Sequence, residues 1–164
     1  MREHRQAMEE ISVREAMGGD VEEAANLVVR MKRLNNEFDP LFTVVDDALE
    51  KARSYLLNSL GSKSALVLVA VKGRSVVGVL RAEVRERTFY KPTMGGNITD
   101  FYILPEHRRK ALGNTMLERA SKALQKLGAQ VVTAEFPAQN EIAAKFYSKR
   151  RFRALTNIYA ESRE

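Results

Sequence analysis

The stretch with the clearest chemical content joins an apolar strand to a long helix, and it runs Ile103-Leu104-Pro105-Glu106-His107-Arg108-Arg109-Lys110-Ala111-Leu112-Gly113-Asn114. Free amides at a helix start point outward at the positive end of the helix dipole, and they bind phosphate where side chains leave room. Ala111 and Gly113 leave that room. Positive charge comes from Arg108, Arg109 and Lys110. The stretch predicts a phosphate site, with an ordinary helix start beside a solvated basic turn as the alternative.

Several other chemistries lack the residues they need. The stretch matches neither the glycine-rich loop typical of ATP binding nor that of dinucleotide binding. The chain has no cysteine, which excludes disulfides, zinc–thiolate sites and cysteine nucleophiles. Only His4 and His107 supply imidazole, so no metal site is expected. A net charge of +6 suggests an anionic partner, leaving open a nucleic acid, an anionic cofactor or simply a basic surface.

Hydrophobic periodicity predicts the elements that must position this stretch. We expect strands at 11–16, 65–71, 75–87, 97–104, 129–136 and 152–160, with helices at about 20–34, 46–60, 109–127 and 138–150. Alternation of strand and helix in the second half requires parallel pairing, whereas the earlier hairpins pair antiparallel. The expected fold class is therefore α/β, with a mixed, mostly antiparallel central sheet, parallel C-terminal pairing and helices on both faces.

The domain and membrane expectations are simple. Residues 1–10 are expected to form a flexible charged segment, and 11–164 a single domain. No segment approaches the roughly 18 continuous apolar residues of a membrane helix. The polar start of the chain has no apolar stretch of the kind found in secretory signals. We expect a cytoplasmic protein with no membrane partner.

Two motifs in this order resemble the GNAT superfamily of N-acetyltransferases, from Ile11 to the end of the chain. The pyrophosphate loop of the family, V-x-P-x-x-R-x-x-G/A-x-G/A, is matched by Ile103, Pro105, Arg108, Ala111 and Gly113. A second motif, N-x-x-A-x-x-F/Y-Y-x-x-x-G-F, is matched by Asn140, Ala143 or Ala144, Phe146, Tyr147 and Phe152, with Arg151 in place of the usual glycine. In pattern the chain is nearest to members resembling the ribosomal-protein N-terminal alanine acetyltransferases.

The resemblance implies a GNAT-like acyl-CoA N-acyltransferase fold with acetyl-CoA as cofactor, CoA as product and no metal. The pyrophosphate would be held by backbone amides of Arg109, Lys110, Ala111, Leu112, Gly113 and Asn114, beside Arg108. The pantetheine arm would pair with the central strand at Phe101 and Ile103, in a gap where this strand splays from the 129–136 strand. Asn140 would contact the arm, and Tyr147 would lie beside the sulfur. The Ile103 amide could polarise the thioester carbonyl.

Proton balance suggests the catalytic residues. An amine with a pKa of roughly 8 to 10.4 is largely protonated at neutral pH, so attack needs a base, and the leaving thiolate needs an acid. Tyr147 is the candidate acid, with simple packing against Phe146 as the alternative. Glu135 is the preferred base, because the alanine acetyltransferase-like members carry a glutamate there; it could instead be a surface carboxylate. Asp100 is the second choice, and Asn97 stands where the family often has a glutamate.

The acceptor is expected to be an amine that attacks directly in a ternary complex. A protein or peptide amine is the first choice, and a small amine such as a polyamine or an aminoglycoside-like compound is the second. A non-catalytic acetyl-CoA-binding regulatory domain stays open, because Arg151 and Asn97 depart from the family pattern. The basic run 145–153 contains aromatics, but the acetyltransferase motif already explains these, so a nucleic-acid partner is not favoured. A homodimer also stays open, since dimers are common among similar proteins.

Overall fold

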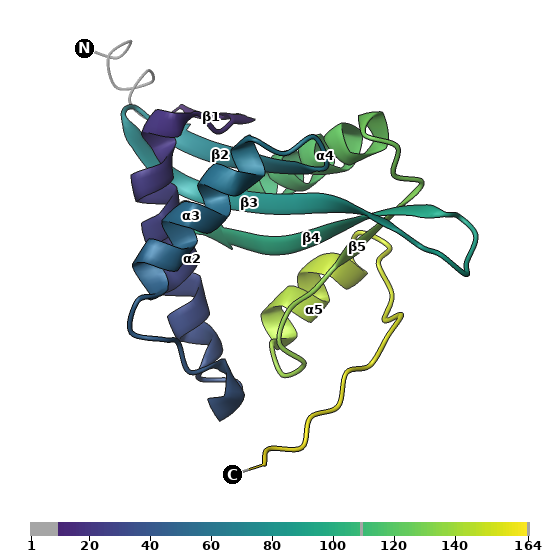
Figure 1. Cartoon of the computed structure of the whole chain (residues 1–164). Coiled ribbons are helices and arrows are strands. Elements are labelled where there is room, and N and C mark those ends of the chain that lie inside the picture. Colours follow the sequence, from purple (N-terminus) through teal and green to yellow (C-terminus); the bar gives the residue numbers. More distant parts are fainter. Residues whose placement is uncertain (1–9, 109, 164) are drawn as a thin grey trace.

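A five-stranded mixed sheet, in the order β1-β2-β3-β4-β5, forms the centre of the computed structural model, which describes residues 10–108 and 110–163 (Figure 1). Its strands are β1 (Ile11–Glu15), β2 (Ala65–Lys72), β3 (Ser75–Glu86), β4 (Met94–Ile103) and β5 (Val131–Ala134). The first four pair antiparallel in sequence order, and β5 pairs parallel to β4. The predicted fold class is confirmed. The prediction of a flexible segment at 1–10 falls, except for residue 10, on residues 1–9, which lie outside the described residues.

Helices cover both faces of this sheet, as the sequence predicts (Figure 1). The face called here the α2/α3 face packs against α2 (Val21–Asn35) and α3 (Ala48–Leu60), through a core that includes Val28 and Leu56. The opposite face, called the α4/α5 face, packs against α4 (Lys110–Lys126) and α5 (Glu141–Ser148), through a core that includes Met116 and Leu124. The sheet therefore separates two hydrophobic cores.

Close packing of α4 on the sheet depends on a glycine in β4. A Cβ atom at Gly96 would lie 2.8 Å from a methyl carbon of Leu124, closer than real Cβ contacts allow. The Leu124 side chain is fully buried. Glycine at position 96 therefore lets α4 lie directly over the paired part of β4 and β5.

The last predicted strand, at 152–160, is wrong, because residues 152–163 form no regular secondary structure. A strand needs backbone partners for its amides and carbonyls. Figure 1 shows this segment extended and leading away from the sheet. Beyond Phe152, its large apolar side chains are left exposed, so that Ile158 is 90% exposed and Tyr159 91%. Alternation of side chains alone does not supply the missing partner strand.

Within the described residues, three short 3₁₀ turns connect these elements, at Gly18–Asp20, Pro40–Phe42 and Pro105–His107. The third joins the end of β4 to the start of α4, where the sequence places its phosphate site. None of the helices in residues 10–108 and 110–163 has the length and hydropathy of a membrane span.

Candidate active site

β4 and β5 separate halfway along β4, which opens a gap between two parallel strands. Their pairing joins residues 95–98 of β4 to residues 131–134 of β5. The last hydrogen bond runs from the Glu135 N–H to the Ile98 carbonyl at 3.1 Å. From Thr99 to Ile103, no strand in the described part of the chain pairs with this edge of β4. The family resemblance in the sequence implied a gap at this place.

A β-bulge in β4 determines which backbone groups face the gap. At Thr99 the register with β3 shifts by one residue. Beyond Thr99, each β4 residue therefore directs its backbone N–H and C=O groups to the opposite side of the strand from that expected without the bulge. The Leu104 N–H donates to β3 at 2.9 Å. Counting back along β4 from Leu104, every second residue also forms its backbone hydrogen bonds with β3. The backbone groups of Phe101 and Ile103 consequently face the gap, and an extended amide-containing arm fits this edge as an added strand would.

Arg108 lies against the end of β4. Its Nε donates to the Ile103 carbonyl at 2.8 Å, and its guanidinium lies 5.2 Å from the centre of the Tyr102 ring. The Ile103 carbonyl is thereby occupied, while the amide of the same residue stays directed to the gap. Arg108 orders the strand end next to the predicted phosphate site, and direct contact with phosphate stays a prediction for it.

The first turns of α4 have small or inward-facing side chains. Ala111 and Asn114 are exposed, whereas Leu112 is buried in the α4/α5 core. A Cβ atom at Gly113 would lie 3.0 Å from the Phe146 ring, so glycine lets α5 approach this turn. The helix begins at Lys110, and Arg109 lies outside the described residues.

Arg150 brings a cation to this helix start, although sequence reasoning did not single it out. Its guanidinium carbon lies 3.6 Å from the centre of the Phe146 ring. Its Nε donates to the Asn114 side chain, and another guanidinium nitrogen donates to the Phe146 carbonyl at 2.6 Å. The basic run 145–153 indicated a cation in this region, but the spacing of its residues does not predict which side chain contacts α4.

Asn140 begins α5. Its Oδ1 accepts a hydrogen bond from the Ala143 N–H at 3.1 Å, as the side chain of an N-cap residue does. Its Nδ2 group stays available for the predicted contact with the cofactor arm.

Tyr147 sits in a cluster of aromatic rings on the α4/α5 face. Its ring stacks on Phe136 at 5.5 Å between centroids and meets Phe146 and Phe152 at 5.1 Å each. Burial raises the pKa of the Tyr147 phenol above its usual value, and the charge of Arg150 opposes this only in part. Tyr147 therefore carries its proton at neutral pH, as a proton donor must.

The turn after α5 keeps its usual form despite the missing glycine. Arg151 adopts a left-handed φ of 67°. The Arg151 N–H donates to the Ser148 carbonyl at 3.2 Å, and the Phe152 N–H donates to the Tyr147 carbonyl at 3.1 Å. These two bonds form a Schellman motif, in which glycine is the commonest left-handed residue. Phe152 is thus placed against Tyr147 even with arginine at position 151.

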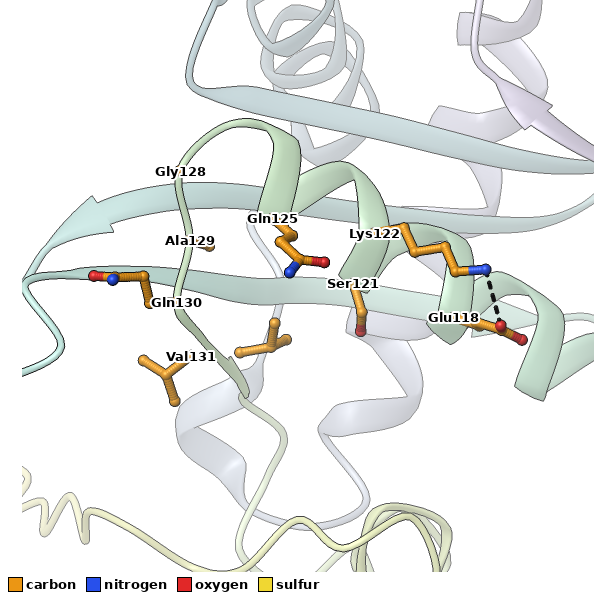
Figure 2. A pocket seen from close by; sticks show the side chains of 9 residues that line it. Glu118, Ser121, Lys122, Gln125, Gly128, Ala129, Gln130 and Val131 are labelled. Atoms are coloured by element: carbon orange, nitrogen blue, oxygen red, sulfur yellow. Dashed lines mark ion pairs between the residues drawn. The ribbon is translucent and has the colours of Figure 1, made fainter.

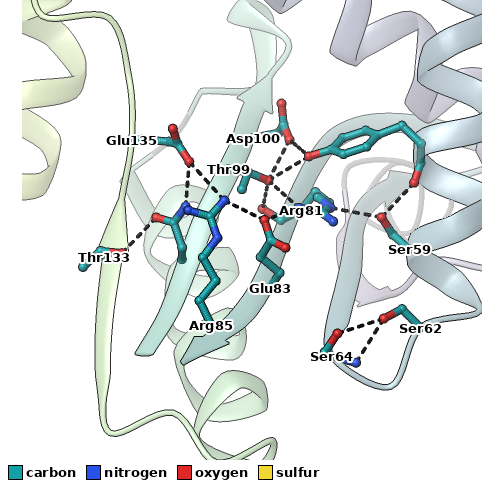
Figure 3. Close-up of polar contacts among 12 residues, drawn as sticks. Ser59, Ser62, Ser64, Arg81, Glu83, Arg85, Thr99, Asp100, Thr133 and Glu135 are labelled. Atoms are coloured by element: carbon teal, nitrogen blue, oxygen red, sulfur yellow. Dashed lines mark hydrogen bonds and ion pairs between the residues drawn. The ribbon is translucent and has the colours of Figure 1, made fainter. Parts of the chain in front are cut away.

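Glu135 lies where β4 and β5 begin to separate. Its Oε1 accepts from the Asn97 amide at 2.6 Å, and Arg85 lies 3.8 Å away (Figure 3). The Asn97 carbonyl oxygen in turn accepts from the Thr133 hydroxyl at 2.9 Å. The Glu135 side chain is 55% exposed. One carboxylate oxygen is therefore held in place while the group stays open to solvent.

Asp100, by contrast, is buried beneath α2 and α3, with its side chain 1% exposed. Its Oδ2 accepts from the Tyr55 hydroxyl at 2.7 Å and the Thr99 hydroxyl at 2.8 Å (Figure 3). Its Oδ1 lies 2.8 Å from the Lys32 ammonium. Burial, and then the charge of Asp100, raises the pKa of the Tyr55 phenol, so this hydroxyl stays a donor.

A chain of polar contacts connects the two carboxylates across the α2/α3 face (Figure 3). Arg81 donates to Glu83 at 3.1 Å and to Thr99 at 3.3 Å, and Arg85 donates to Glu83 at 2.7 Å. The structure therefore places both candidate bases, Glu135 and Asp100, in one network on the α2/α3 face, and Tyr147 in the aromatic cluster on the other face.

Two hollows lie at different distances from this network. The larger, about 550 Å³, lies between the C-terminal half of α4 and residues 128–132, where Glu118, Ser121, Lys122 and Gln125 line it (Figure 2). None of the candidate site residues borders it. The smaller, about 250 Å³, lies beside α3 and is bordered by Tyr55, Ser59, Arg81 and Glu83 of the network. The smaller hollow therefore adjoins the network that contains the candidate bases, although neither Glu135 nor Asp100 lines it.

No group of three or more His, Cys, Asp or Glu side chains in residues 10–108 and 110–163 is arranged to hold a metal ion.

Comparison with known proteins agrees with this geometry. The family model for acetyltransferases of the GNAT family matches residues 31–152. Among curated proteins, none matches the sequence.

Solved structures share the fold at low identity. An aminoglycoside 6'-N-acetyltransferase of Acinetobacter haemolyticus aligns with a TM-score of 0.73 and 15% identity, over 93% of this chain and 98% of that one. A predicted acetyltransferase of Clostridium acetobutylicum, solved with acetyl-CoA, gives 0.71 and 15%, over 94% and 96%. A GCN5-related N-acetyltransferase of Ralstonia eutropha gives 0.76 and 17%, over 93% and 99%. At these identities the likeness concerns the fold alone.

Proposed function

The chain belongs to the GNAT family of acetyltransferases, and from this premise we propose that it moves the acetyl group of acetyl-CoA to a primary amine by direct attack. The observation that carries the proposal is the gap beside β4. It is bordered by the backbone of Phe101 and Ile103, and β4 leads through a short turn to the start of α4. An extended thioester arm and its pyrophosphate need these two features together.

Binding falls to the α4/α5 side of the gap. The amides at the start of α4 hold the pyrophosphate, and Arg150 adds positive charge beside Asn114. Phe101 and Ile103 offer backbone groups to the arm, and the Ile103 amide polarises the carbonyl of the acetyl group. Acetyl-CoA supplies the activated thioester when it is bound.

Glu135 and Tyr147 divide the proton transfers. Glu135 is half exposed and held by Asn97 at the closed end of the gap, so it can take a proton from an incoming ammonium directly or through water. Tyr147 holds its proton because burial raises its pKa. It donates this proton to the thiolate that leaves. Asp100 is buried, with two hydroxyl donors on Oδ2 and the Lys32 ammonium beside Oδ1, which favours an electrostatic role for it over that of the base.

The acceptor we propose first is a protein or peptide amine, in keeping with the pattern of the N-terminal alanine acetyltransferases. A small amine with more than one positive charge is the second candidate. One observation favours it: the hollow of about 250 Å³ adjoins a face that carries three carboxylates, Glu83, Asp100 and Glu135. Each of these carboxylates is paired with a cation, Lys32, Arg81 or Arg85, so a cationic acceptor would bind here by displacing one of them.

Transfer to amines tests the proposal directly. The protein is incubated with acetyl-CoA and either peptides with free N-termini or polyamines, and release of CoA thiol is measured. Glu135→Gln should lower kcat by about 100-fold or more, because a general base contributes about that much. Glu118→Gln, an exposed carboxylate far along α4, is the control and should not change kcat. A Glu135→Gln protein with full turnover at every pH would contradict the assignment. Binding of acetyl-CoA without any transfer would favour a regulatory domain instead.

A further inference from the structure

Asp100 is a buried carboxylate that depends on a loosely held cation. Its side chain is 1% exposed, whereas the Lys32 side chain that neutralises it is 45% exposed. Arg81, although close by, pairs with Glu83 instead. In the described part of the chain, no other cationic side chain lies within ion-pair distance of Asp100. One displaceable ammonium therefore balances this charge.

Two hydroxyl groups orient the carboxylate that faces this cation. Tyr55 and Thr99 both donate to Oδ2 and fix the carboxylate, so that Oδ1 is directed toward Lys32. Tyr55 is itself held by the guanidinium of Arg81, 4.5 Å from its ring centre. These contacts come from α3, β3 and β4, whereas Lys32 comes from α2, so the donors that orient the carboxylate do not include Lys32.

A lysine ammonium and the ammonium of a primary amine have the same chemistry. Both are compact charges with three rotatable N–H donors, and each suits a carboxylate that it meets end-on. Asp100 lies at the bulge of β4, one residue before Phe101, whose backbone faces the gap. Its carboxylate is on the face of the sheet opposite the aromatic cluster, where an acceptor would approach.

We propose that Lys32 occupies the ammonium subsite of the acceptor, and that an acceptor with a second positive charge binds by displacing Lys32 from Asp100. This inference rests on the proposed function, since it assigns the subsite of the amine in the same reaction. One ammonium of the acceptor replaces Lys32 at Oδ1, and another amine of the same molecule reaches Glu135 and the gap. Lys32 thereby lowers the affinity for acceptors that use this subsite, and it leaves unchanged the affinity for singly charged acceptors, which need only Glu135 and the gap.

Calorimetric titration with spermidine, in the absence of acetyl-CoA, tests the displacement separately from acetyl transfer. Lys32→Met keeps the length of the side chain but removes its charge. It should bind spermidine about threefold to tenfold more tightly than the wild type. In the wild type Lys32 occupies the subsite most of the time, and the apparent affinity falls in proportion to the fraction of molecules in which the subsite is free. The control Lys51→Met removes the same charge from an exposed pair on α3 and should bind as the wild type does. Asp100→Asn in the Lys32→Met background should abolish the gain.

A second measurement uses the wild-type protein, in case Lys32→Met does not fold. NMR of the protein labelled with ¹³Cε-lysine follows the Lys32 signal, assigned through Lys32→Arg. Spermidine should move this signal toward the position of a free lysine and leave the Lys51 signal in place. An unmoved Lys32 signal, or Lys32→Met binding spermidine no more tightly than the wild type, would overturn the inference. Failure of acetyl transfer, by contrast, would appear only in the transfer assay and would concern the proposed function.

Discussion

At the same point of β4, the two faces of the sheet carry different kinds of side chain. On the α4/α5 face, Phe101, Phe146 and Tyr147 pack ring against ring, beside a core in which Met116 and Leu124 are fully buried. On the α2/α3 face the adjacent position, Asp100, joins a network of hydroxyls, carboxylates and guanidinium groups. The difference suggests that one face holds a cofactor by shape and backbone, and the other holds a charged acceptor.

The largest expected effect compares the contributions of the two faces to stability. Leu124→Ala removes a fully buried side chain and should lower the free energy of unfolding by about 3 kcal/mol. Tyr55→Phe leaves Asp100 with one hydroxyl donor fewer and should cost about 1 to 2 kcal/mol. Urea unfolding of both variants gives the two values. A larger loss in Tyr55→Phe would mean that the polar face, rather than the apolar one, stabilises the fold.

A smaller effect should appear at alkaline pH. Burial raises the pKa of Tyr147, so the folded protein keeps a proton that the unfolded chain loses above about pH 10. The stabilisation is complete below this pH, and it is lost by about 1.4 kcal/mol per pH unit as the pH rises toward the folded pKa.

Tyr147→Phe should therefore reduce the slope of unfolding free energy against pH, measured in urea between about pH 9 and 11.5. Tyr159→Phe, at an exposed position, is the control and should leave the slope as it is. An unchanged slope in Tyr147→Phe would indicate that the hydroxyl is open to solvent. The α4/α5 face would then differ less from the polar α2/α3 face than the burial of Tyr147 implies.

The smallest effect concerns the turn that closes the aromatic cluster. Arg151→Gly relieves a left-handed φ of 67°, which costs an ordinary residue roughly 1 to 2 kcal/mol. Glycine also gives more freedom to the unfolded chain, which offsets about half of that gain. The variant should therefore be more stable by about 0.5 to 1 kcal/mol in thermal unfolding. A loss of stability would show that the Arg151 side chain makes a contribution that outweighs the strain.

Much of the α4/α5 face could be predicted from the sequence, because its information is local. The helix start near Gly113 and the aromatic pair Phe146 and Tyr147 lie within short motifs, and the expected gap beside β4 is present. The antiparallel hairpins and the parallel C-terminal pairing followed from the alternation of strands and helices. Only contacts within a few residues, or between consecutive elements, were needed for these predictions.

The polar network could not be predicted, because it depends on contacts between distant residues. Asp100 meets Lys32 and Tyr55 from two different helices, and the bulge at Thr99 has no sequence signature of its own. The prediction of a strand at 152–160 was wrong for a related reason. Alternation of side chains predicts a strand but does not supply a neighbouring strand with which it can pair.

The most direct test of the account is calorimetric titration with acetyl-CoA. The wild type should bind in the micromolar range. Gly113→Val, which forces a side chain against Phe146, and Arg150→Met, which removes the cation beside Asn114, should each bind about tenfold more weakly. Lys122→Met, an equal loss of charge far along α4, should bind as the wild type does. No binding, or equal binding by all four proteins, would contradict a cofactor site at the start of α4.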